Sequence, residues 1–194
     1  MERFISGAVD RFIAKEVILQ ENKKIYEFEL KQGITIIFNL IIIVFIGLIF
    51  GELWNLMIFT IAYLALRSYA GGYHAETEVG CYMLSILMIL VVVLISKLVE
   101  LNFLLEVIGV LLATGVLWVF APIEDYRKPL DEKETKVYKK KLRKILFVEL
   151  VLLAASRTVF NDFYLMVFVS VLFVAFVVLL GVMKNNTISR NFKP

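Results

Sequence analysis

The chain has 194 residues, of which 60% are hydrophobic, and its mean hydropathy is +0.83. Soluble domains are about 45–50% apolar, so this excess excludes an ordinary soluble domain and indicates an integral membrane protein. The single cysteine excludes an intrachain disulfide, and a net charge of only +3 gives no sign of a nucleic-acid partner.

Residues 1–24 have the spacing of an amphipathic helix. Apolar residues recur at helical intervals, and charged residues occupy the other side. The apolar set is Phe4, Ile5, Ala8, Val9, Phe12 and Ile13, and the charged set is Arg3, Asp10, Arg11 and Lys15. We expect this helix, within an amphipathic segment 1–30, to lie in the cytoplasmic headgroup layer. Packing on the protein's own soluble face is the alternative.

Six apolar stretches follow, at 34–50, 53–66, 82–96, 102–120, 145–160 and 163–183. A spanning helix needs ~20 apolar residues. The stretches 102–120 and 163–183 meet this length, whereas 53–66 and 82–96 need flanking polar residues to complete them. The pattern predicts an all-α polytopic membrane protein. It has about six transmembrane helices and one domain over 1–194, with a transmembrane core at 34–183.

Two short breaks between stretches predict tight connections. Gly51 and Glu52 alone separate the first two stretches, which form a hairpin or a pair that does not fully cross the membrane. Asn161 and Asp162 separate the last two.

The distribution of lysine and arginine predicts the orientation in the membrane. Residues 1–33 hold six of these side chains, 121–144 hold nine, and the tail 184–194 holds three. Six spans would place all three segments on one side, and basic segments mark the cytoplasm. We therefore expect both termini, and the polar segment 67–81, on the cytoplasmic side of the plasma membrane.

The segment 67–81 contains the chain's only histidine, His74, and its only cysteine, Cys81. A thiol and an imidazole are the minimum parts of a cysteine nucleophile with its general base. Cys81 also begins an apolar stretch, where a helix N-terminus would stabilise a thiolate. The alternative is a buried, inert cysteine beside an incidental histidine.

The spacing of this pair constrains its backbone. In one straight helix, seven residues span ~10.5 Å, which is too far for the ~3 Å contact of a nucleophile and its base. A catalytic pair therefore requires a break between His74 and Cys81. Gly71, Gly72 and Gly80 provide the backbone freedom for a turn.

Three charged neighbours have two readings each. Arg67 would hydrogen-bond a substrate or a loop carbonyl, or else extend to the lipid headgroups. Glu76 and Glu78 would orient His74, as the third member of a triad does, or else be solvated loop charges.

A zinc site is the competing chemistry for this segment. One His and one Cys supply two of the four ligands of a structural zinc site, so only a symmetric dimer would complete one. We expect no metal and no cofactor.

Glu149 and Arg157 are charged residues within an apolar stretch, two turns apart. Both would face the interior of a helix bundle, or each would lie at the end of a span. Six spans with such residues are compatible with a second class of protein, a membrane transporter or peptide exporter. No nucleotide-binding motif and no inverted repeat supports that class.

Arg67, the run Gly71-Gly72-Tyr73-His74-Ala75 and Cys81 form an Arg-x4-Gly-x-His-x6-Cys pattern. A basic linker begins at Ala121-Pro122 and ends at Lys139–Lys144. In these features, and in length and hydropathy over essentially the whole chain, the sequence resembles the accessory gene regulator B family of bacterial membrane peptidases.

The resemblance implies a cysteine endopeptidase that removes the C-terminal tail of a small quorum-sensing pro-peptide. Cys81 would be the nucleophile and His74 the general base, while Arg67 and Gly72 match positions needed for activity and Gly71 adjoins them. An acyl-thioester on Cys81 would then yield a thiolactone or a lactone.

The pro-peptides of this family are amphipathic with an acidic tail. The basic segments 11–31 and 127–144 would attract that tail, or anionic lipid. A homodimer, the ring chemistry and export of the product stay open.

Overall fold

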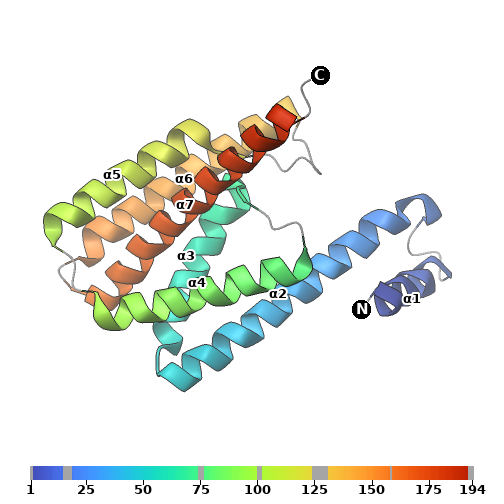
Figure 1. Cartoon of the computed structure of the whole chain (residues 1–194), viewed down its shortest axis with the longest axis horizontal. Coiled ribbons are helices and arrows are strands. Elements are labelled where there is room, and N and C mark those ends of the chain that lie inside the picture. The colour runs from blue at the N-terminus through green and yellow to red at the C-terminus, as the bar shows by residue number, and fades with distance from the viewer. Residues whose placement is uncertain are drawn as a thin grey trace. The chain divides into compact units, whose positions relative to one another are not determined.

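The computed structural model describes residues 2–14, 19–73, 77–99, 102–123, 131–157 and 159–191. These residues form seven α-helices and one turn of 3-10 helix, and their only β-pairing is an isolated bridge between Gly71 and Ile123 (Figure 1). The helices are α1 (Glu2–Ala14), α2 (Lys23–Phe50), α3 (Leu53–Ala70), α4 (Glu78–Leu98), α5 (Phe103–Phe120), α6 (Glu132–Ser156) and α7 (Asn161–Asn191). The predicted all-α class is confirmed.

Residues 1–45 form one compact unit, and residues 46–194 form a second. In the first, Ile5 and Val9 are buried on one face of α1, and Lys23 pairs with Asp10 at 2.6 Å. The amphipathic helix is therefore present, but it ends at Ala14 instead of continuing to residue 24. Leu19 is extended and leads into the 3-10 turn Gln20–Asn22.

Within the described residues, four helices, where the sequence predicted about six, are long and apolar enough to cross a membrane. They are Gly33–Phe50, Val79–Leu98, Phe103–Phe120 and Asn161–Asn186. The other two predicted spans are helical but more polar. Asn55, Thr60 and Arg67 are polar residues within α3, and α6 begins with a basic, charged half. Together the helices still make this a membrane protein.

The centre of the second unit is α7, which packs against α3, α4, α5 and α6. Its candidate span is 56% buried, compared with 17% for each of the other three. The apolar residues of α4 and α5 that are left exposed, such as Leu87, Leu111 and Leu112, suit contact with lipid chains. A central α7 matters for function because its later turns contact the segment after α3.

The end of the bundle where α6 finishes and α7 begins holds a polar cluster. The Arg157 guanidinium contacts one oxygen of the Glu106 carboxylate, with Nη2 at 2.7 Å and Nε at 2.9 Å. The Tyr164 hydroxyl donates to the same oxygen at 3.0 Å, and Arg157 lies over the Phe103 ring at 4.4 Å. Arg157 therefore pairs with α5 instead of simply extending to the headgroups.

Glu149 lies on the buried face of α6, together with Leu146 and Leu153. Its side chain is only 4% exposed, and neither carboxylate oxygen has a hydrogen-bond partner among the described residues. The prediction that Glu149 faces the interior of the helix bundle is therefore confirmed.

Candidate active site

The chain turns sharply where α3 ends. Gly71 follows the helix with φ +65°, and its N–H donates to the Arg67 carbonyl at 3.3 Å. Gly72 also has a positive φ, +123°. These values lie in the left-handed region that glycine adopts without a steric penalty. The predicted turn at Gly71 and Gly72 is confirmed.

The segment from Gly71 to Tyr73 is held on one side by the residues that follow α5. The Ile123 N–H donates to the Ala70 carbonyl at 2.9 Å, and Gly71 and Ile123 form the isolated bridge. The two backbones approach so closely that a Cβ on Gly71 would overlap the Ile123 carbonyl oxygen. Only glycine fits this position.

The same segment is held on its other side by α7. The Tyr73 N–H donates to the Val177 carbonyl at 3.0 Å, and the Lys184 Nζ lies 5.2 Å from the centre of the Tyr73 ring. A Cβ on Gly72 would lie 2.9 Å from the Val177 oxygen, and a Cβ on Gly181 would lie 2.9 Å from the Gly72 carbonyl carbon. The backbone at Gly72 can approach α7 this closely because neither Gly72 nor Gly181 has a side chain.

Arg67 completes the support of this segment from within α3. Its Nη2 donates to the Tyr73 carbonyl at 2.9 Å. Of the partners expected for Arg67, the structure therefore shows a loop carbonyl. Tyr63, one turn earlier on the same helix, hydrogen-bonds Arg67. The end of α3 is therefore joined to Tyr73 through Arg67.

Cys81 lies in the first turn of α4 and is half-buried. Thr77 caps this helix in an extended conformation. Its side-chain oxygen accepts the Gly80 N–H at 3.1 Å, and its carbonyl accepts the Cys81 N–H at 3.1 Å. Residues 74–81 are therefore not one unbroken helix, and the predicted break is confirmed. The helix begins at Glu78, so Gly80 is helical and provides no turn.

The predicted partners of Cys81 are the least described part of the site. His74 and Glu76 lie outside the described residues, and Glu78 is described only as the first residue of α4. The contact between His74 and Cys81 therefore stays a prediction. The residues on either side of 74–76 are both anchored, Tyr73 by Arg67 and α7 and Thr77 by the cap of α4.

Basic side chains gather at this end of the bundle, which we call the basic end. Tyr69 packs edge-on against Tyr138 at 5.7 Å, and Lys141 lies 5.1 Å from the Tyr69 ring. Arg143 lies 4.1 Å from the Trp118 ring at the end of α5. These contacts place the first half of α6 beside the end of α3.

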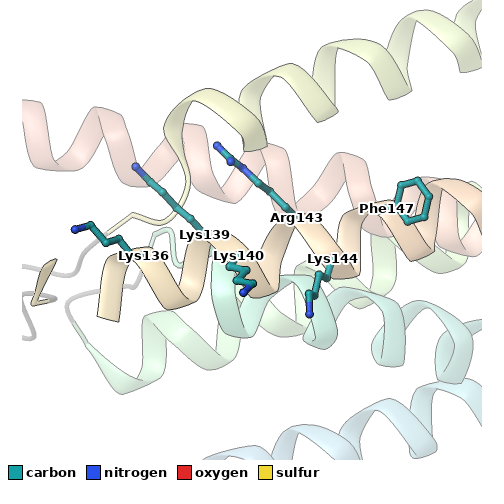
Figure 2. A pocket seen from close by; sticks show the side chains of 6 residues that line it. All are labelled: Lys136, Lys139, Lys140, Arg143, Lys144 and Phe147. Carbon is teal, nitrogen blue, oxygen red and sulfur yellow. The ribbon is translucent and has the colours of Figure 1, made fainter. Parts of the chain in front are cut away.

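The outer surface of α6 carries an open groove of ≈ 510 Å³. Figure 2 shows Lys136, Lys139 and Arg143 extending from one side of the helix and Lys140 and Lys144 from the other. Phe147 lies at the apolar end of this surface. The groove therefore presents five positive charges next to one aromatic ring.

Sequence reasoning missed the residues that support the segment from outside α3 and α4, namely Ile123, Val177 and Gly181. Gly181 did carry a signal, because it is the only glycine in the apolar stretch 163–183. The backbone groups of Ile123 and Val177 carried none.

Comparison with known proteins gives a consistent family match. The family model described as Accessory gene regulator B matches residues 7–178. The putative AgrB-like protein 2 of Clostridium perfringens (strain 13 / Type A) is 28% identical over 155 residues, which cover 73% of this chain and 72% of that protein. The putative AgrB-like protein of Halalkalibacterium halodurans is 28% identical over 127 residues, 63% of this chain and 62% of its own length. The accessory gene regulator protein B of Staphylococcus aureus (strain Newman) is 30% identical over 80 residues, 39% of this chain and 42% of its own. No solved structure matches the chain significantly.

Proposed function

The chain belongs to the accessory gene regulator B family, and we propose that it is a membrane cysteine endopeptidase with Cys81 as nucleophile and His74 as general base. Membership of this family connects the protein with the processing of quorum-sensing peptides. One observation carries the enzymatic proposal: the residues flanking 74–76 are anchored, and Cys81 lies one helical turn beyond the second anchor. A nucleophile and its base require such fixed placement.

The proposed reaction has two steps. His74 takes the proton from the Cys81 thiol, and the sulfur attacks a peptide carbonyl carbon of the precursor. When the C–N bond breaks, the amine of the departing tail takes the proton, and an acyl-thioester remains on Cys81. A thiol or hydroxyl within the precursor then displaces Cys81 and closes a thiolactone or lactone.

The N-terminus of α4 is the candidate oxyanion site. The N–H groups of Gly80 and Cys81 are already bonded to Thr77. The first N–H groups of a helix have no partner within it. The N–H groups of Glu78 and Val79 are therefore the ones we propose for stabilising the tetrahedral intermediate.

We propose that the groove on α6 attracts the acidic tail of the precursor. The five basic side chains of this groove create the positive potential that would steer such a tail. Anionic lipid headgroups would compete for the same surface. A matched charge reversal, Lys139→Glu and Lys140→Glu, should raise the KM for a precursor with an acidic tail and leave that for a tail-neutralised precursor unchanged. An equal rise for both would favour a lipid role.

We propose that the basic end faces the cytoplasm. Arg67, Lys141, Arg143 and Lys184 lie together there, and such an excess marks the inner side of a membrane. An impermeant thiol reagent should therefore label Cys81, the only cysteine, in inverted vesicles and not in intact cells. Labelling from outside alone would reverse this orientation.

Trapping of the intermediate tests the reaction. The protein, in vesicles with a short amphipathic precursor peptide that has an internal Cys or Ser and an acidic tail, should accumulate an adduct that intact mass assigns to Cys81 and that hydroxylamine removes. Cys81→Ser should abolish the adduct and cleavage, because a hydroxyl is far less ionised than a thiol at neutral pH. Ser96→Ala, later on the same helix, is the control. A transporter would show no adduct in any variant, and cleavage by Cys81→Ser would remove Cys81 from the role.

A further inference from the structure

The segment from Gly71 to Tyr73, which immediately precedes His74, lies directly against α7. Val177 accepts the Tyr73 N–H, and Gly181, one turn further on, contacts the Gly72 backbone. We infer that Val177 and Gly181 form a seat on α7 that positions His74 for its work on Cys81. This inference rests on the proposed function, since it assumes that His74 is the base.

The seat depends on the absence of a side chain at Gly181. An alanine Cβ there would lie 2.9 Å from the Gly72 carbonyl carbon and 3.0 Å from the Tyr73 nitrogen. Ordinary contact between such atoms is ~3.5–4.0 Å, so the segment would have to move by roughly 0.5–1 Å. Both contacted atoms belong to the backbone, so no side-chain rotation can accommodate the methyl group.

The bond to Val177 makes the contact directional. Within α7, the Val177 carbonyl is the acceptor of the Gly181 N–H in the regular helical pattern. A carbonyl oxygen has two lone pairs, so it can also accept the Tyr73 N–H at 3.0 Å. Arg67 holds the other side of the same residue through the Tyr73 carbonyl. The N–H and the carbonyl of Tyr73, the residue before His74, are therefore both held.

Movement of this segment would be transmitted to His74. Consecutive α-carbons are ~3.8 Å apart and are joined by a planar peptide, so a displaced Tyr73 displaces the next residue. A general base must lie ~2.6–3.2 Å from its partner, and a misplacement of ~1 Å costs ~10²-fold in rate. Gly181→Ala should therefore slow acylation of Cys81 by roughly 10- to 100-fold. Gly181 is a positioning residue and not a catalytic one.

The pH dependence of Cys81 alkylation separates positioning from general damage. The chain has one cysteine and one histidine, so iodoacetamide consumption by the full-length protein in detergent reports on Cys81 alone. His74→Ala should move the alkylation curve to higher pH, because the imidazole no longer helps the thiol to ionise. Gly181→Ala should move it in the same direction. Arg67, Tyr63 and Glu78 are present in every variant.

Two controls make the comparison specific. Gly115 is also a helical glycine, but a Cβ there would meet nothing within 4 Å, so Gly115→Ala should keep the wild-type curve. The double variant His74→Ala, Gly181→Ala should match His74→Ala alone, because the seat acts only through His74. A wild-type curve for Gly181→Ala would overturn the seat while leaving the Cys81–His74 pair intact. A wild-type curve for His74→Ala would overturn the pair and the seat together.

Hydrogen exchange of the unaltered protein supplies a test that does not depend on a variant folding. The Tyr73 amide should exchange slowly, because it is bonded to Val177 on the most buried helix of the bundle. Exchange of this amide at the rate of an unstructured peptide would overturn the seat.

Discussion

Replacing Gly71 with alanine tests how closely the segment before His74 is held by the residues after α5. The backbone of Gly71 has φ +65° and ψ −151°, a region that is almost exclusive to glycine. Residues forced into such regions carry about 1–3 kcal/mol of strain. The new methyl group would also overlap the Ile123 carbonyl, so the two backbones would have to separate.

That separation weakens the bond from the Ile123 N–H to the Ala70 carbonyl, at present 2.9 Å. A hydrogen bond of this kind contributes about 1 kcal/mol net. Together the two effects amount to about 2–4 kcal/mol, which in a chain of this length lowers the unfolding temperature by roughly 5–15 °C. Thermal unfolding in detergent measures the shift, and Cys81 alkylation reports whether the site is disturbed.

Gly51→Ala is the matched control for this experiment. Gly51 also has a positive φ, +70°, but a Cβ there would meet nothing within 4 Å. Gly51→Ala therefore measures backbone strain without the contact to Ile123. The contact between Gly71 and Ile123 does not hold this segment if Gly71→Ala is no more destabilising than Gly51→Ala, or if Gly71→Ala leaves the alkylation of Cys81 unchanged.

Four further substitutions test the polar groups of the bundle by thermal unfolding. Tyr164→Phe removes one hydrogen bond to Glu106 and should cost about 1 kcal/mol. Glu106→Gln weakens three contacts at once and should cost more; an equal or smaller loss would show that the Arg157 pair contributes nothing. Glu149→Gln should leave stability unchanged or raise it, because the buried carboxylate has no partner among the described residues; a loss above about 2 kcal/mol would reveal one. Asp131→Ala should cost about 1 kcal/mol by removing the capping box of α6, with no effect on Cys81 alkylation.

The helices themselves were predictable, because apolar runs of this length have few alternatives in a membrane protein. Their ends were less so. The stretch 82–96 became Glu78–Leu98, since Thr77 caps the helix within a polar segment, and 145–160 became the second half of Glu132–Ser156, which starts at the capping box of Asp131. Hydropathy is insensitive to polar turns that continue a helix.

The turn at Gly71 and Gly72 was also predictable, because two adjacent glycines provide the backbone freedom for one. The spacing of His74 and Cys81 required a separate break, which the extended Thr77 provides. The seat on α7 was not predictable. Val177 and Gly181 lie more than 100 residues after Tyr73 in the chain, and their contribution is a carbonyl oxygen and a missing side chain. A carbonyl oxygen is present at every residue, and a single glycine in an apolar stretch does not indicate which backbone it contacts. Such contacts become visible only when the helices are packed together.

The bond between Tyr73 and Val177 and the bond between Ile123 and Ala70 both run from main chain to main chain, and this has a consequence for how the sequence can change over evolution. A carbonyl or an N–H is present whatever the side chain, so Val177 and Ile123 can be exchanged for other apolar residues without losing these bonds. Gly71, Gly72 and Gly181 allow no such exchange, since any methyl group strikes a neighbouring backbone. Among relatives, the large side chains around this segment should therefore drift, while the positions that have no side chain at all stay fixed.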